Sequence, residues 1–294
     1  MVEVFGTVAG AMSVAALFNN AVDTLGYIKL GRHFARDFER CQLKLDIART
    51  RLARWGNAVD ITGTPRYNLV MPQDDESQRV CTILEAIMLL FQDAQKVSER
   101  YALSKLTDGS NLEYCDPATS LTETGRRTHE RLLARIATLQ KGTSFAKKAA
   151  WALYDAKDFD RLIVEIAELI GSLEKLTMTQ PVPRRLVEIE IEEMDDDVPS
   201  LMLLQDASSG VDAVLQEVVT DRVSALSSRN HIGTLKAIDR ARAKAGDHWA
   251  IEAMVKANSG FRTAPSDNKV DNADMAGDSR LHVGNSYGGG SLWD

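Results

Sequence analysis

The sequence predicts an all-α helical bundle followed by a C-terminal region of a different kind. Through most of residues 35–226, apolar residues recur at three- and four-residue spacing, as they do on the buried face of amphipathic helices. Beyond about Ser227, Gly, Asn, Asp and Ser become frequent and long aliphatic residues become rare. We therefore expect a helical domain over residues 1–226. Residues 227–294 form a separate region, which is too polar to fold alone and should be disordered in the monomer.

Short breaks separate the predicted helices. Leu45, Leu52 and Trp55 share one apolar face in residues 35–59, which predicts the first strong helix. Residues 74–106 contain a second long helix. Further helices are expected at about 120–140, 144–155, 158–176 and from Pro199 to about Leu226. Residues 186–197 begin with alternating charge, which fits either a strand or the start of an exposed helix.

The N-terminal stretch from residue 4 to residue 22 carries no charge. Its length is at the lower limit for a membrane span, and Gly6, Gly10 and Ser13 lie on a ridge of small residues of the kind that lets membrane helices approach closely. Its weak hydropathy favours a buried core helix instead. The candidate membrane-inserting segment covers residues 1–28 and includes Leu17 and Phe18.

Composition and motifs exclude several classes of function. A net charge of −7 argues against a general nucleic-acid binder. Three widely spaced cysteines without a C-x-x-C pattern indicate reduced thiols in a cytoplasmic protein. No P-loop, nucleophile elbow, zinc-protease or dinucleotide-binding motif occurs, and no His/Cys cluster has metal-ligand spacing. We expect no enzymatic activity, no catalytic residues, no metal and no cofactor.

The C-terminal region contains two segments that repeat each other, residues 230–249 and 268–287, at an offset of 38 residues. Both copies end with an aromatic residue, Trp249 in the first and Tyr287 in the second. Repeats of this length are usually stacked units, and roughly three or more are needed for stability. Two copies with open ends must therefore stay disordered or stack on other chains.

If the repeats are strands, their side chains alternate between two faces. Stacking one copy on the other places Asn230 over Asn268 in an amide ladder, and it places Arg240 over Asp278 so that charges alternate. Gly246 and Gly284 lie where the chain must turn a corner. The predicted apolar core consists of Ile232, Leu235, Ala243, Ala245, Val270, Ala273, Leu281 and Val283. The alternative is a plain helix over residues 230–257, because AIDRARAKA is rich in helix formers.

Several segments resemble the fungal HET-S/HET-s proteins of filamentous ascomycetes over nearly the whole chain. They are FGTVAGAMSVAALFNN, LGRHFARDFERCQLKLDIARTRLARWG, KKAAWALYD, VEIEIEE, the paired repeats and the closing YGGGSLWD. The resemblance implies a helical HeLo domain and a prion-forming region, which becomes a β-solenoid with two rungs per molecule in the amyloid. It also implies a second asparagine ladder at Asp247 and Asn285, which Asp247 should weaken, and a tail pocket of Tyr287, Leu292 and Trp293.

The family resemblance also implies a mechanism and partners. Refolding of the prion-forming region makes the HeLo domain membrane-active, its N-terminal segment inserts into the membrane, and the cell dies in heterokaryon incompatibility. The implied partners are other copies of the chain, allelic HET-S/HET-s variants, a NOD-like receptor with a matching repeat, and membrane lipid. Some family members lack the killing activity and act as prion antagonists, which is the second hypothesis. A helical adaptor with a disordered tail is the third.

Two residues flank the point where the N-terminal segment would be released, Asp23 and His33. A protonation switch at His33 is one interpretation, and an ordinary surface histidine is the favoured one.

Overall fold

The computed structural model describes residues 12–107, 113–140, 151–177, 182–194, 197–227, 230–245, 248–249, 268–283 and 286–287. Contacts between Cα atoms divide the chain into two compact units, Met1–Val219 and Thr220–Asp294. The division falls inside one helix, seven residues before the boundary predicted after Leu226. The predicted domain boundary itself stays a prediction.

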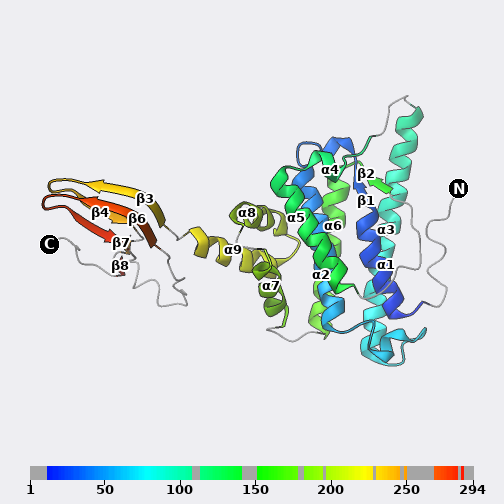
Figure 1. Cartoon of the computed structure of the whole chain (residues 1–294). Helices are drawn as coiled ribbons and strands as arrows, with labels where there is room; N and C mark the ends of the chain where they lie inside the picture. Colours follow the sequence, from blue (N-terminus) through cyan, green and yellow to red (C-terminus); the bar gives the residue numbers. More distant parts are fainter. Residues whose placement is uncertain are drawn as a thin grey trace. The chain divides into compact units, whose positions relative to one another are not determined.

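The first unit is a helical bundle, which confirms the predicted all-α class (Figure 1). Its long helices are α1 (Val14–Tyr27), α2 (Phe38–Ala58), α3 (Asp75–Thr107), α5 (Glu123–Leu139) and α6 (Ala156–Thr177). Its shorter helices are η1 (Arg32–Phe34), η2 (Pro65–Asn68), α4 (Pro117–Ser120), α7 (Val182–Glu192) and α8 (Val198–Ser208), and α9 (Ala213–Ser227) begins in this unit and ends in the second. Helix α2 lies at the centre and contacts α1, α5, α6 and α8.

Helix α1 packs into this core. Its first turn is capped by Ser13, whose hydroxyl accepts a hydrogen bond from the Ala16 amide at 3.3 Å. The Phe18 ring meets Trp55 of α2 edge to face at a centroid distance of 5.9 Å. This approach requires a glycine at position 56, because a Cβ atom there would lie 2.2 Å from the Phe18 ring. Gly56 thus allows α1 to lie directly against α2.

The prediction of a helix at residues 144–155 is wrong for residues 151–155, the part of this range that the structure describes. Trp151–Leu153 is a strand, β2, which pairs in parallel with β1 (Ile28–Leu30). The first and last residues of each strand are buried, as expected when side chains alternate between two faces. Ser98 of α3 donates a hydrogen bond to the Ala152 carbonyl. Pairing with β1 overrides the helical propensity of the alanine-rich sequence. Residues 144–150 lie outside the described part.

Two other segments differ from simple helical expectations. Within residues 186–197, where a strand and a helix were both open, helix α7 extends to Glu192 and buries Val187 and Ile191, four residues apart on one face. The single helix predicted from Pro199 to Leu226 is wrong, because the chain breaks between α8 and α9. Gly210 adopts a φ of 74° at the break, a left-handed conformation that ends a helix.

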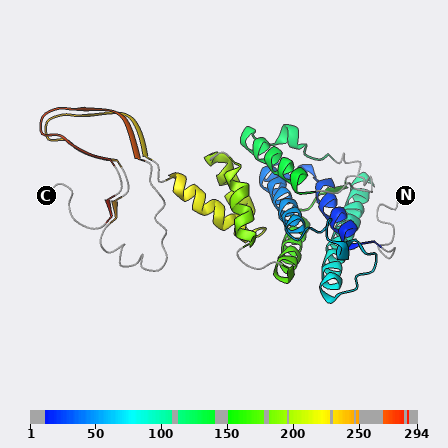
Figure 2. The same ribbon diagram turned by 60° about the horizontal axis from the view of Figure 1, so that its bottom comes forward.

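The described residues of the second unit form three strand pairs. They join β3 (Asn230–Ala237) to β6 (Asn268–Met275), β4 (Arg242–Ala245) to β7 (Arg280–Val283), and β5 (His248–Trp249) to β8 (Ser286–Tyr287), each in parallel. The two repeats follow one path, side by side (Figure 2). The described residues of 230–257 are therefore strands and turns in this structure, and the alternative helix is absent from them.

Candidate functional site

The C-terminal unit pairs the two repeats residue for residue. Each Cα pairing in its strands joins residues that are 38 positions apart, such as Asn230 with Asn268 and Ile232 with Val270. Lys236 lies opposite Asp274, so these two paired positions carry opposite charges. The pairing continues through β4–β7, and in β5–β8 it joins Trp249 to Tyr287.

Two apolar positions of the second repeat are more exposed than their partners in the first. Ala245 is 4 % exposed, whereas Val283, its partner in β7, is 38 % exposed. Similarly, Leu235 is half-buried while Ala273 opposite to it is exposed. Single-chain pairing therefore leaves Ala273 and Val283 of the second repeat uncovered.

Each repeat turns between its first two strands at one left-handed residue. Asp239 has a φ of 60° and Gly277, 38 residues later, has a φ of 71°. The turns stack closely, since a Cβ atom on Gly277 would lie 3.0 Å from the Asp239 Cα and carbonyl oxygen. Hydrogen bonds from the Ala276 amide to the Ala237 carbonyl and from the Arg280 amide to the Ala241 carbonyl, at 2.9 and 2.8 Å, join the two turns.

Sequence reasoning missed this turn and assigned corners only to later glycines. The available signal was Asp239 opposite Gly277, because Asp and Gly are the residues that accept left-handed backbone most readily. Several predicted residues lie outside the described part of the chain: Gly246, Asp247, Gly284, Asn285, Leu292 and Trp293.

The two residues of the predicted charge pair lie in the stacked turns of the two repeats. Arg240 and Asp278 occupy equivalent turn positions and are exposed, and no ion pair joins these two described side chains. Within β7, the Nε2 atom of His282 is buried, whereas Arg280 is exposed.

The predicted membrane segment is only partly described. Gly6 and Gly10 lie outside the described residues. Leu17 and Phe18 are each 2 % exposed and belong to the core of the bundle. In the part of the chain that the structure describes, no helix is long and apolar enough to cross a membrane.

Polar contacts tie the end of α1 to its neighbours. Asp23 is buried, and its Oδ1 atom accepts a hydrogen bond from the Gln140 side chain at 3.0 Å. Its Oδ2 atom is buried without a hydrogen-bond partner. Arg49 of α2 donates from Nε to the Val22 carbonyl at 2.9 Å. Burial lowers the pKa of Arg49, and the charges of Asp23 and Asp46 counteract that effect.

The other switch candidate is an exposed histidine. The Nε2 atom of His33, in η1, lies 3.2 Å from the Tyr101 hydroxyl, and the two rings meet edge to face. Asp23 and His33 have different partners, so the described contacts do not bring them into one site.

Two arginines of α2 hold the start of α9. Nη1 of Arg51 donates to the Val211 carbonyl at 2.6 Å, and Nη2 contacts Glu174 of α6 at 2.5 Å. Arg54 is 3 % exposed and lies between two buried carboxylates, with Nε 3.0 Å from Glu190 of α7 and Nη1 3.0 Å from Asp212. We call the five charged residues Arg51, Arg54, Glu174, Glu190 and Asp212 the α9 clamp.

Asp212 has two roles in the α9 clamp. Its Oδ1 atom accepts a hydrogen bond from the Leu215 amide at 3.0 Å and so caps the first turn of α9. Burial opposes the charged form of Asp212, but Arg54 and Arg51 outweigh it and hold the pKa of this carboxyl below its usual value. Burial likewise disfavours the charge on Arg54, yet Asp212 and Glu190 raise its pKa above the ordinary value.

Little in the sequence points to the α9 clamp. The apolar period of α2 places Arg51 and Arg54 between the core positions, where a solvated face is the ordinary interpretation. Their carboxylate partners are more than a hundred residues away in sequence. The period of apolar residues indicates which face of a helix is buried, but it does not predict ion pairs between residues so far apart in sequence.

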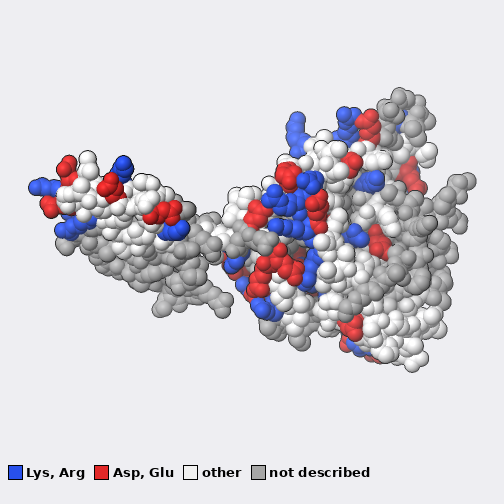
Figure 3. Space-filling view, viewed as in Figure 1, with Lys and Arg blue, Asp and Glu red and all other residues white. Residues whose placement is uncertain are grey.

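Surface charge and potential metal ligands are two further features of the described residues. On the face shown in Figure 3, acidic and basic side chains lie beside one another over the helices, so no broad surface of one sign appears there. Among the residues that the structure describes, no three His, Cys, Asp or Glu side chains gather as metal ligands would.

Comparison with known proteins identifies the family. The family model "HeLo: Prion-inhibition and propagation" matches residues 6–204. The chain belongs to the HeLo family. Heterokaryon incompatibility protein s of Podospora anserina is 41 % identical and protein S of the same fungus is 40 % identical, in both cases over 100 % of both chains. The expected relation to the HET-S/HET-s proteins is thereby confirmed.

Solved structures agree with the fold of the HeLo domain. The structure of the HET-s N-terminal domain is 43 % identical and matches with a TM-score of 0.70, covering 74 % of this chain and 100 % of that chain. A double mutant of the same domain matches with a TM-score of 0.68 and covers 73 % of this chain. Both contain the HeLo domain alone, so the likeness concerns the helical part.

Proposed function

We propose that this HeLo protein is an amyloid-triggered, membrane-disrupting cell-death effector of fungal heterokaryon incompatibility. The single observation that carries the proposal is the parallel pairing of the two repeats at a constant offset of 38 residues. Its full-length relatives in Podospora anserina are named heterokaryon incompatibility proteins, which supports the same general role here. Such a role needs no catalytic site.

Templated growth follows from the open edges of the paired strands. A parallel pair leaves backbone N–H and C=O groups unpaired on both outer edges, and these groups can accept further strands. The uncovered apolar positions of the second repeat, such as Val283, offer a matching surface to the first repeat of another copy. Contact with a fibril brings residues 227–294 into it as two rungs of a β-solenoid.

The α9 clamp connects strand formation in the repeats to the helical domain. Helix α9 ends at Ser227 and strand β3 begins at Asn230, so only two residues separate them. When β3 joins a fibril, tension or steric crowding acts on α9 and on the capping residue Asp212. Displacement of Asp212 leaves the buried Arg54 with one of its two carboxylate partners, which is costly.

Release of α1 is the last step of the proposal. Helix α1 is held by the bundle core and by the contacts of Arg49 and Gln140 with its C-terminal end. Once the bundle opens, residues 1–28 leave it and insert into lipid. A cell membrane is therefore the destination of the activated protein, and a receptor with a matching repeat supplies the natural template.

The test measures dye leakage from liposomes with the full-length protein, alone and with preformed fibrils of residues 227–294. We expect leakage only when fibrils are added. Leakage without fibrils would contradict templated activation. Failure of residues 227–294 to form fibrils would contradict the proposed role of the repeats.

A prion antagonist is the second candidate function. The observation that favours it is the burial of α1, whose apolar residues Leu17 and Phe18 lie in the core, and no described helix is able to span a membrane. The same experiment separates the two candidates. Fibrils that grow by adding the full-length protein without any leakage would select the antagonist, which acts by binding an allelic partner.

A further inference from the structure

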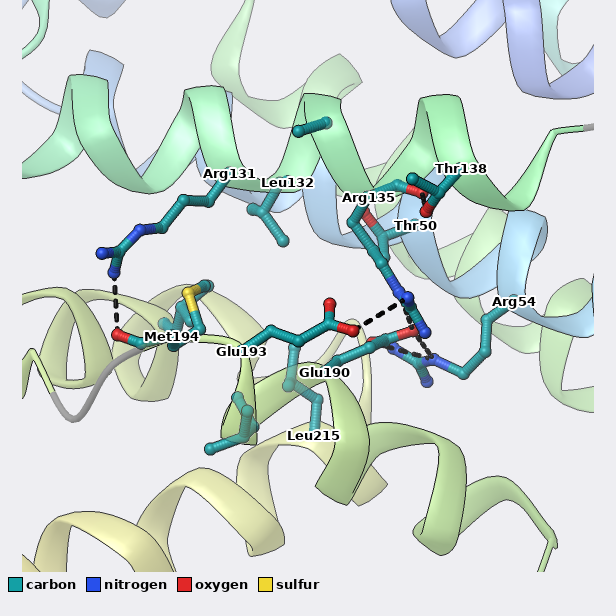
Figure 4. Close-up of a pocket in the computed structure, with 13 residues that line it drawn as sticks. Thr50, Arg54, Arg131, Leu132, Arg135, Thr138, Glu190, Glu193, Met194 and Leu215 are labelled. Carbon is teal, nitrogen blue, oxygen red and sulfur yellow. Dashed lines mark hydrogen bonds and ion pairs between the residues drawn. The ribbon is translucent and has the colours of Figure 1, made fainter.

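A cavity of about 300 Å³ lies in the helical unit beside the α9 clamp. Residues of α2, α5, α7, α8 and α9 contribute to its wall (Figure 4). The apolar part of the wall consists of Leu132, Ala134, Ile191, Met194, Leu204 and Leu215. This volume falls at the lower end of the range for small-molecule sites, which are mostly apolar and carry a few convergent polar groups.

Two buried donor atoms of the cavity wall, one on Arg135 and one on Arg54, have no hydrogen-bond acceptor. Arg135 projects from α5 toward Glu190 and Glu193, but its Nε atom is buried without a hydrogen bond and lies 3.6 Å from the nearer oxygen of Glu190. Glu190 already accepts two hydrogen bonds from Nε of Arg54. Nη1 of Arg135 is 3.4 Å from Glu193, a half-exposed carboxylate in a weak pair.

Arg54 of the same wall is hydrogen-bonded to Glu190 and Asp212 but also has one such donor atom. Nη2 of Arg54 is 2.9 Å from Oε2 of Glu190 as an ion pair, yet it too is buried without hydrogen-bond geometry. No acceptor atom of the described cavity wall is left buried and unpaired in this way. Buried unpaired polar atoms are rare in folded proteins and usually mark a bound water or ligand.

We propose that this cavity is a binding site for a small amphipathic anion, with a carboxylate or similar oxyanion head and an aliphatic chain. The head group binds Arg135, whose guanidinium suits a two-oxygen acceptor. The chain occupies the apolar wall between α5 and α9. The inference concerns the resting HeLo domain and does not depend on the proposed function.

Occupancy has a structural consequence. A ligand held by Arg135 of α5, Leu204 of α8 and Leu215 of α9 would join three helices beside the α9 clamp. Because it binds the folded domain and has no site in the unfolded chain, it would raise the melting temperature increasingly as its concentration rises.

The test measures binding of octanoate to the full-length protein by equilibrium dialysis, together with the shift of Tm. Octanol and acetate serve as probes that keep only the chain or only the head group. We expect one saturable octanoate per chain, a higher Tm, and binding of both other probes at least ten-fold weaker, because hydrogen bonds to charged groups and buried methylene groups each contribute strongly to affinity.

Two variants with matched controls locate the site. Ala134→Trp fills the cavity from an exposed position, and Ala137→Trp makes the same change on the exposed face of the same helix outside the cavity wall. Arg135→Gln removes the head-group donor, and Arg185→Gln removes an exposed arginine of α7. We expect about ten-fold or greater loss of octanoate affinity in Ala134→Trp and Arg135→Gln and none in the controls.

Three results would overturn the proposal. Absence of saturable octanoate binding would show that only water satisfies the arginines. Equal affinity for octanol would show that the anionic head group does not contribute to binding. Unchanged binding in Ala134→Trp would place the octanoate elsewhere.

Discussion

At the scale of single residues, the helical domain depends on a small number of buried charges whose partners are distant in sequence. Asp212 combines a buried ion pair with Arg54 and the N-terminal cap of α9 in one side chain. A carboxylate in such a position is more than a surface charge, because its loss leaves the buried Arg54 with one acidic neighbour in place of two.

The Asp212→Asn substitution tests this role. Asparagine retains the capping oxygen but loses the charge, so we expect the free energy of unfolding at pH 7 to fall by about 1.5–3 kcal/mol, the range for hydrogen bonds to charged groups. The pKa of Asp212 is lowered in the folded state, so its contribution is present above the unfolded value of 3.8 and is lost as pH falls through the folded value.

Urea unfolding at several pH values checks this expectation, with the exposed Asp206→Asn as the control. The difference between Asp212→Asn and the natural protein should shrink toward acid pH. A difference that stays constant down to the lowest pH would contradict the assigned role of the charge.

The His129–Asp46 pair predicts the opposite pH dependence. Nδ1 of His129 lies 2.6 Å from the buried Oδ2 of Asp46, and this hydrogen bond is the main cause that raises the pKa of His129 above 6.5. A raised histidine pKa stabilises the fold fully below the unfolded value of about 6.5, and the stabilisation disappears as pH rises through the folded value.

We therefore expect the stability of the helical domain to decrease as pH rises above 6.5, and His129→Gln to remove this decrease. Thermal unfolding between about pH 6 and pH 9 measures it. His33→Gln, which changes an exposed histidine of the same domain, should leave the slope intact. An unchanged slope in His129→Gln would contradict the assignment.

At the scale of elements, the turn between the first two strands of each repeat controls how the repeats stack. Gly277 adopts a left-handed φ, and a Cβ atom at this position would lie only 3.0 Å from the backbone of Asp239. An alanine there meets both a conformational cost of roughly 1–2 kcal/mol and a close contact with backbone.

Gly277→Ala should therefore slow fibril growth of residues 227–294 by about ten-fold, measured by dye fluorescence with fixed seeds. Gly233→Ala is the matched control, because nothing lies within 4 Å of its Cβ position. Asp239→Gly, at the equivalent turn, relieves the same left-handed cost and should speed growth. Equal rates for the two alanine variants would exclude the described turn from the growing fibril.

The elements also show what the sequence permits one to predict. Helices α2, α3, α5 and α6 were predicted within a few residues, because each has a long apolar period that packing preserves. The strand at Trp151–Leu153 was predicted as a helix, since its alanine-rich sequence says nothing about the β1 partner more than a hundred residues away.

The break between α8 and α9 was missed for a local reason. Gly210 follows two serines, a weak signal inside a stretch that otherwise has good helix formers. The charges of the α9 clamp were missed for a different reason, since pairing between distant residues leaves no trace in one sequence. The repeat offset, in contrast, is a property of the sequence itself.

At the scale of the whole molecule, the proposed mechanism requires that strand formation act mechanically on the helical domain. The two residues between Ser227 and Asn230 are the only spacer between α9 and β3. A Gly/Ser insertion of about 20 residues after Ser227 would span roughly 25 Å as a flexible coil and would relieve that force.

We expect this insertion to abolish fibril-triggered leakage while seeded fibril growth continues at its former rate. Liposome leakage and fibril growth are measured on the same preparation, so growth serves as the internal control. Leakage that persists with the insertion would show that the fibril activates the HeLo domain in some way other than through the short connection.

The two-residue spacer and the paired repeats together set a geometric limit. Strands in a sheet are about 4.7–4.9 Å apart, so in the proposed fibril a molecule that contributes two rungs would occupy roughly 9.5 Å of fibril length. A single α-helix with its side chains is already about 10–12 Å wide, and the domain attached to each pair of rungs contains many helices.

Successive HeLo domains along one fibril thus have less axial room than their own width. They must splay outward, alternate around the fibril, or lose their packed structure, and the short spacer restricts the first two. Crowding of this kind grows with each added molecule and is absent in a free chain. In the proposed fibril, steric crowding alone would therefore suffice to unfold the attached HeLo domains, without a binding site for the domain and without a chemical signal.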